Sequence, residues 1–70
     1  MSTTRGTVVE FDQVRGDGWI VAESGERYYF HCVAIADGTR SIPVGSTVQG
    51  QRRVGLLGAD ELVDVYSVGL

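Results

Sequence analysis

The chain has 70 residues, enough for one small domain with a marginal hydrophobic core. Its six arginines and nine acidic residues give a net charge of −3, which argues against a uniformly basic nucleic-acid binder but allows a local basic patch. A single cysteine excludes an internal disulfide. One cysteine with one histidine does not make a usual metal site, so we expect no metal and no cofactor.

The sequence contains no long apolar segment. We therefore expect neither a signal peptide nor a membrane-spanning segment, and no membrane partner. A cytoplasmic location is the resulting expectation.

The first half of the sequence predicts three short strands. Residues 1–5 are expected to form a short polar tail, and Gly6–Asp12 combines β-branched and aromatic residues typical of a strand. A connection containing glycine leads to a second strand over Gly18–Glu23, and a tight turn at Ser24-Gly25 joins it to a third over Arg27–His31. Strands at such short spacing indicate an antiparallel meander.

The second half predicts two further strands separated by loops. Val33–Ala36 is apolar but too short for a stable helix, so we expect one helical or 3₁₀ turn there. A loop over Asp37–Gly45 precedes a strand over Ser46–Val54, in which Gly50 indicates a bulge or a sharp bend. A last strand is expected over Glu61–Val68, with Leu62, Asp64 and Tyr66 alternating against Val63 and Val65 on the opposite face.

These elements together predict an all-β domain over residues 6–68. Three consecutive short strands followed by two more are typical of a small closed or partly closed barrel. A five-stranded antiparallel OB-type β-barrel is the leading architecture.

The second and third strands predict a surface on which flat rings gather. Successive strand residues point to opposite faces of a sheet. Three large side chains of these strands can therefore share one face: Ile20, Tyr28 and Phe30. If that set points inward, three rings are displayed together outside as a stacking platform: Trp19, Tyr29 and His31. Arg15 would lie at its rim, and rings beside a cation can stack unpaired bases. Phe11 belongs either to the core or to the platform, because the alternation is unreliable where the first strand bends.

Three segments, with their order and spacing, carry a resemblance to a known family: Gly6-Thr7-Val8 with Phe11-Asp12, Arg15-Gly16-Asp17-Gly18-Trp19-Ile20, and Tyr28-Tyr29-Phe30-His31. They are similar to the opening Gly-(Thr/Lys)-Val-Lys-Trp-Phe-Asn and the two nucleic-acid motifs, Lys-Gly-Phe-Gly-Phe-Ile and Val-Phe-Val-His, of the bacterial cold-shock proteins. The resemblance covers nearly all of the chain, because residues of the second half also follow the family pattern: Ala34-Ile35, Gly38 with Arg40-Ser41-Ile42, and Val44-Gly45 with Val48. It implies an OB-type barrel that binds single-stranded RNA or DNA, as an RNA chaperone or a regulator of translation or transcription. It assigns contacts to five residues: Phe11, Arg15, Trp19, Tyr29 and His31.

The chain departs from the family pattern at four contact positions, where aromatic residues of the family are replaced: Glu10, Asp17, Cys32 and Thr39. Base–aromatic stacking contributes about 1–3 kcal/mol per base, so the resemblance implies a divergent member with weak binding or a different base preference. Glu10 and Asp17 either reflect a simple loss of contacts or select a ligand by accepting hydrogen bonds from cytosine or guanine amino groups.

A second interpretation is a protein-interaction module that kept the barrel and lost the nucleic acid. Leu56 and Leu57 form an apolar loop that either covers the barrel mouth or binds a protein partner, including a second copy of the chain. A basic rim of Arg15, Arg27 and Arg40 would favour nucleic acid, and an acidic rim would favour protein. Catalysis is not expected, because no nucleophile lies at a suitable spacing from a base and the single histidine lacks an evident partner.

Overall fold

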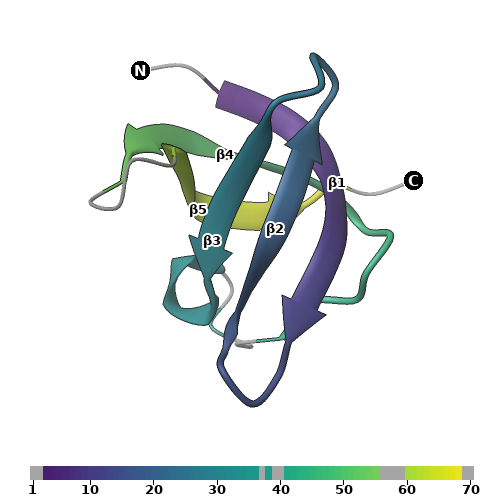
Figure 1. The fold of residues 1–70 in the computed structure, drawn as a ribbon, viewed down its shortest axis with the longest axis vertical. Coiled ribbons are helices and arrows are strands. Elements are labelled where there is room, and N and C mark those ends of the chain that lie inside the picture. The colour runs from purple at the N-terminus through teal and green to yellow at the C-terminus, as the bar shows by residue number, and fades with distance from the viewer. Residues whose placement is uncertain (1–2, 37, 39–40, 56–59, 69–70) are drawn as a thin grey trace.

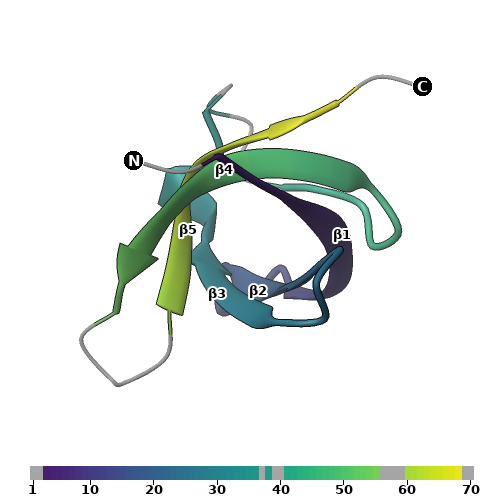
Figure 2. The same cartoon turned by 90° about the horizontal axis from the view of Figure 1, so that it is seen from above.

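The computed structural model describes residues 3–36, 38, 41–55 and 60–68, which form a closed barrel in the order β1-β2-β3-β5-β4. The elements are β1 (Thr3–Asp12), β2 (Asp17–Ala22), β3 (Arg27–His31), the 3₁₀ turn η1 (Cys32–Ala34), β4 (Thr47–Val54) and β5 (Asp60–Ser67). In Figure 1 the hairpin of β2 and β3 faces the viewer, and Figure 2 shows the strands curving around a common centre. No helix in the described part of the chain has the length and hydropathy needed to cross a membrane.

The five expected strands and the short 3₁₀ turn are present, and most strand ends fall within one residue of the prediction. The start of β1 differs. It begins at Thr3 rather than Gly6, and residues 3–5 pair with β4, where Thr3 faces Gln51. Part of the segment expected to be a tail therefore belongs to the barrel.

The prediction that the barrel is antiparallel throughout is wrong at one seam. β3 and β5 are parallel, with Tyr29 facing Glu61, and a second parallel bridge joins Ile35 to Val65. The cause is topological, because neighbouring strands cannot alternate in direction all the way around a closed ring with an odd number of strands. The other four seams are antiparallel, so the fifth must be parallel.

A bulge in β1 sets which of its side chains face the barrel interior. Val8 pairs with Ile20 and Glu10 with Trp19, so Val9 is an extra residue on β1. Val8 is fully buried, whereas Val9 and Glu10 are both exposed, which interrupts the strict alternation of an ideal strand.

A second bulge lies between β4 and β5. The register places Gly50 opposite two residues, Asp64 and Val65, and Asp64 has a positive φ of 53°. Gly50 correctly indicated a bulge in this pair, but the extra residue is on β5, and the expected alternation along β5 fails there. As a result Leu62 and Val65 are both fully buried.

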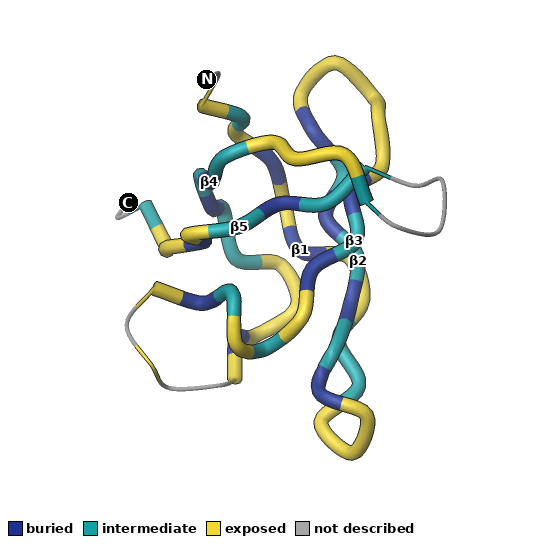
Figure 3. The backbone as a smooth tube through the Cα atoms, turned by 90° about the vertical axis from the view of Figure 1, so that its left-hand side faces the viewer, coloured by how far each residue is buried: buried dark blue, intermediate teal, exposed yellow. Residues whose placement is uncertain are grey.

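The core is formed by the inward side chains of all five strands and of Ile35 and Ile42. The predicted core residues Ile20, Tyr28 and Phe30 are buried as expected. Tyr28 keeps its hydroxyl at the edge of the core, where it donates a 2.7 Å hydrogen bond to the Glu26 carboxylate. Buried and less buried positions alternate along β2 and β3 (Figure 3). The less buried side chains of the two strands therefore share the outer face of the barrel.

Candidate nucleic-acid interface

The outer face of β2 and β3 brings together the three rings of the predicted stacking platform. Trp19 and Tyr29 are directly paired across the two strands and are half-buried, while His31 at the end of β3 is exposed. The rings of Trp19 and Tyr29 meet edge to face, with centroids 5.7 Å apart and an interplanar angle of 73°. Regular alternation along both strands explains why the sequence pattern predicted this face.

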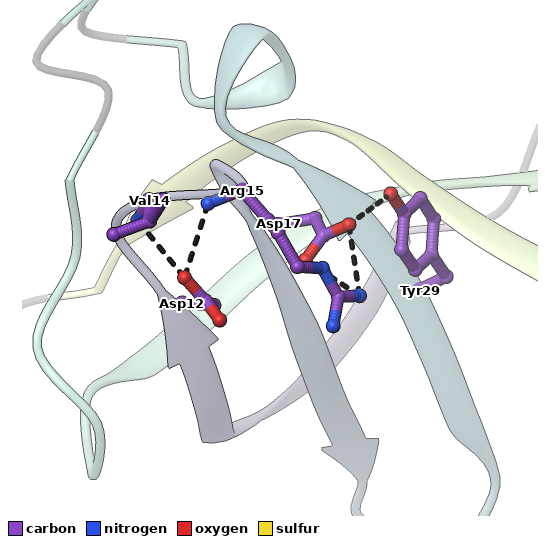
Figure 4. A network of polar contacts seen from close by, with 5 residues as sticks. All are labelled: Asp12, Val14, Arg15, Asp17 and Tyr29. Carbon is purple, nitrogen blue, oxygen red and sulfur yellow. Dashed lines mark hydrogen bonds and ion pairs between the residues drawn. The ribbon is translucent and has the colours of Figure 1, made fainter.

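Asp17 lies between Arg15 and Tyr29 and binds both (Figure 4). The Tyr29 hydroxyl donates a 2.7 Å hydrogen bond to Oδ2 of Asp17, and the Arg15 guanidinium lies 3.1 Å from Oδ1. The hydrogen bond from Tyr29, followed by that from Arg15, lowers the pKa of Asp17 below its ordinary value, although desolvation opposes this shift. The same Asp17 hydrogen bond raises the pKa of Tyr29. Asp17 thus holds the Tyr29 ring in place and neutralises much of the charge of Arg15.

The turn that carries Arg15 is organised by Asp12. Oδ1 of Asp12 accepts hydrogen bonds from the backbone N–H groups of Val14 and Arg15, at 2.9 and 3.0 Å (Figure 4). Gly16 follows with a positive φ of 75°, a conformation that glycine adopts without steric cost. This turn fixes the backbone at Arg15, whose side chain remains 64% exposed.

Arg27 contributes the cation that lies against the Trp19 ring. Its guanidinium carbon is 5.0 Å from the ring centroid, within the range of a cation–π interaction. From the sequence, Arg27 was predicted only at a basic rim. Arg27 lies two residues before Tyr29, on the same face of β3, and Tyr29 pairs with Trp19. This spacing could have predicted that Arg27 contacts the Trp19 ring.

His31 has a structural role as well as its place on the outer face. Its Nδ1 accepts a 3.3 Å hydrogen bond from the backbone N–H of Val33 and so caps η1. The Sγ atom of the half-buried Cys32 lies 3.8 Å from the same nitrogen. With Nδ1 accepting, the neutral ring carries its proton on Nε2, which is then a hydrogen-bond donor.

Phe11 lies on the core side of the barrel rather than with the other predicted site residues. Its ring stacks on Phe30, with centroids 5.7 Å apart and an interplanar angle of 19°. Phe11 pairs with Gly18, where an added Cβ would lie only 2.1 Å from the carbonyl oxygen of Glu10. The bulge at Val9 accounts for this inward orientation of Phe11, and the alternation rule alone left the choice open.

Positive charge on the described surface is largely compensated by nearby carboxylates. Of the five arginines among the described residues, four form ion pairs: Arg5 with Glu23, Arg15 with Asp17, Arg52 with Asp60, and Arg53 with Glu61. Arg40, Thr39 and the loop residues Leu56 and Leu57 lie outside the described residues. Within the described ranges, no group of three or more His, Cys, Asp or Glu side chains is arranged to hold a metal ion.

Comparison with family models found no match to the sequence, and comparison with curated proteins found none. Comparison of structures gives a clear result. The barrel is similar to the solved structure "drosophila Unr CSD456", a cold-shock-domain protein, with a TM-score of 0.79 over 97% of this chain and 17% sequence identity. This chain spans 27% of the length of that one. The chain therefore has the OB-type barrel fold of a cold-shock domain.

Proposed function

We propose that this chain binds single-stranded RNA or DNA on the outer face of β2 and β3. The observation that carries the proposal is the outward-facing, half-buried pairing of Trp19 with Tyr29, beside Arg27, on a barrel of the cold-shock type. Bases would stack on Trp19, Tyr29 and His31, because every base has a flat face and needs no specific hydrogen bond to stack.

Binding of a base to Trp19 requires Arg27 to move aside or to share the ring. A cation–π contact at an exposed site contributes about 0.5–1 kcal/mol, whereas stacking of a base contributes about 1–3 kcal/mol. Stacking of a base on Trp19 is therefore favoured over the contact with Arg27. Displaced from the ring, the Arg27 guanidinium is available for a neighbouring phosphate, where it offsets part of the repulsion from the acidic side chains.

We propose that the affinity is weak. Stacking on Asp17 is impossible, and the ion pair that Asp17 forms with Arg15 reduces the positive charge available for phosphate. Because neutralisation of phosphates supplies much of the affinity of such proteins, few free cations imply weak and rapidly reversible binding. Such binding suffices for an RNA-chaperone role, in which unpaired strands are briefly withheld from competing duplexes. The proposal involves no chemical step and no cofactor.

Substitution of Tyr29 tests the proposal. Tyr29→Ala is expected to weaken binding of a fluorescently labelled oligouridine about fivefold or more, because a stacking ring is lost. Tyr29→Phe keeps the ring and is expected to bind close to the wild-type level. Tyr66→Ala is the matched control, because this exposed tyrosine of β5 bonds to Gln49, away from the platform. Equal anisotropy titrations for Tyr29→Ala and Tyr66→Ala would argue against the proposed site.

A second candidate function is a protein-interaction module, and the pairing of four described arginines with carboxylates favours it. Affinity capture with and without nuclease separates the two candidates. A protein partner retained after nuclease treatment, together with no oligonucleotide binding, would favour the second one.

A further inference from the structure

The bulge in β1 places a carboxylate beside the tryptophan of the platform. Glu10 pairs directly with Trp19, and opposite residues of such a pair have Cβ atoms about 5 Å apart. Val9 and Glu10 are both exposed, so the Glu10 side chain lies on the outer side of the barrel, as Trp19 does.

The two acidic residues at family contact positions are not equivalent in this structure. Both carboxylate oxygens of Asp17 are engaged, by Tyr29 and Arg15, and its side chain is only 13% exposed. Glu10 is exposed, and within the described residues its side chain forms no hydrogen bond or ion pair. Glu10, rather than Asp17, is therefore free to accept hydrogen bonds from a ligand.

The edges of the four bases differ in what they offer to a carboxylate. A carboxylate only accepts hydrogen bonds, and its two oxygens suit two adjacent donors. On its Watson–Crick edge guanine presents such a pair, N1–H and the 2-amino group. Uracil and thymine present one donor flanked by two carbonyl oxygens, while cytosine and adenine place a ring nitrogen acceptor beside their amino group.

We propose that Glu10 makes this surface prefer guanine at the position that stacks on Trp19. This inference rests on the proposed function and adds the base that the site selects. Attraction to the two guanine donors is one part of the preference. The other part is repulsion, because the carboxylate faces acceptor atoms when any other base occupies the ring.

The expected size of the guanine preference follows from the discrimination that bidentate contacts between side chains and bases provide. A good bidentate pair between a side chain and a base discriminates by about 1–3 kcal/mol, and an exposed site belongs at the low end of that range. We expect guanine to bind about fivefold to tenfold more tightly than uracil at this position. Inosine, which keeps N1–H and lacks the 2-amino group, is expected to fall between the two.

The experiment uses short oligouridines that carry one central guanosine, inosine or uridine, titrated against the full chain with Trp19 emission as readout. Glu10→Gln is compared with the wild type, because glutamine has nearly the same shape but no longer offers two acceptor oxygens. Asp64→Asn is the matched control. It makes the same change of net charge at an exposed residue of β5, a strand that pairs with neither β1 nor β2, and asparagine tolerates its positive φ.

The inference predicts a guanosine preference in the wild type and in Asp64→Asn, and its loss in Glu10→Gln. Equal binding of the three oligonucleotides by the wild type would overturn the inference while leaving the proposed function intact, and so would a guanosine preference that survives Glu10→Gln. The absence of any Trp19 response to all three would overturn both.

Discussion

Asp17 shows how one residue changes the character of the outer face. An aromatic ring at this position would add a stacking surface, as the resemblance to cold-shock proteins implies. The carboxylate instead holds the Tyr29 hydroxyl at 2.7 Å and pairs with Arg15. The platform therefore has fewer rings, but one of them is firmly oriented.

The lowered pKa of Asp17 predicts a pH-dependent contribution to stability. Because the folded-state pKa lies below the ordinary value of 3.8, the contribution is fully present above that value and is lost as the pH falls through the folded pKa. Asp17→Asn is expected to lower the free energy of unfolding by about 1 kcal/mol at neutral pH, since hydrogen bonds to a charged group are replaced by neutral ones. Urea unfolding at pH 7 and at pH 2 measures this difference, which should shrink at the lower pH. A difference that is equal at both values would contradict the role assigned to the carboxylate.

At the scale of elements, pattern rules succeeded where the strands are regular. Strict alternation along β2 and β3 was enough to predict that Tyr28 and Phe30 are buried and that Trp19 and Tyr29 lie outside. β1 and β5 each contain a bulge, and a rule based on a period of two has no means of locating an extra residue. The inward position of Phe11 could not be predicted for this reason.

The close pairing of β1 with β2 predicts a specific intolerance to substitution at Gly18. An added Cβ there would meet the Glu10 carbonyl oxygen at 2.1 Å, and a backbone atom cannot move aside without shifting β1. Gly18→Ala is expected to lower the free energy of unfolding by about 3 kcal/mol or more, which is a large share of the stability of a domain of this size. Gly25→Ala is the control, because no atom lies within 4 Å of the added Cβ and only its positive φ opposes the change, at a cost of about 1–2 kcal/mol. Similar unfolding midpoints for the two variants would show that β1 and β2 are not so closely apposed.

At the scale of the whole molecule, the sequence motifs were sufficient to predict an OB-type barrel, and the similarity to a solved cold-shock-domain structure confirms that fold. The parallel pairing of β3 with β5 was missed, although it follows from closing a ring of five strands. The ion pairs of the arginines also escaped prediction, because each joins residues whose proximity depends on strand register or turn geometry, as with Arg53 and Glu61.

The central claim is that an acidic barrel binds unpaired strands mainly by stacking and only secondarily by charge. The most direct measurement uses Trp19, the only tryptophan, and follows its emission during titration with oligo-dT and oligo-rU at low and moderate salt. Binding dominated by stacking predicts saturable quenching with a shallow salt dependence. The slope of log K against log salt is expected to be about −0.7 for each phosphate contacted, with only one or two such contacts. Emission that stays unchanged at high oligonucleotide concentration in low salt, for a chain shown to be folded, would contradict the claim.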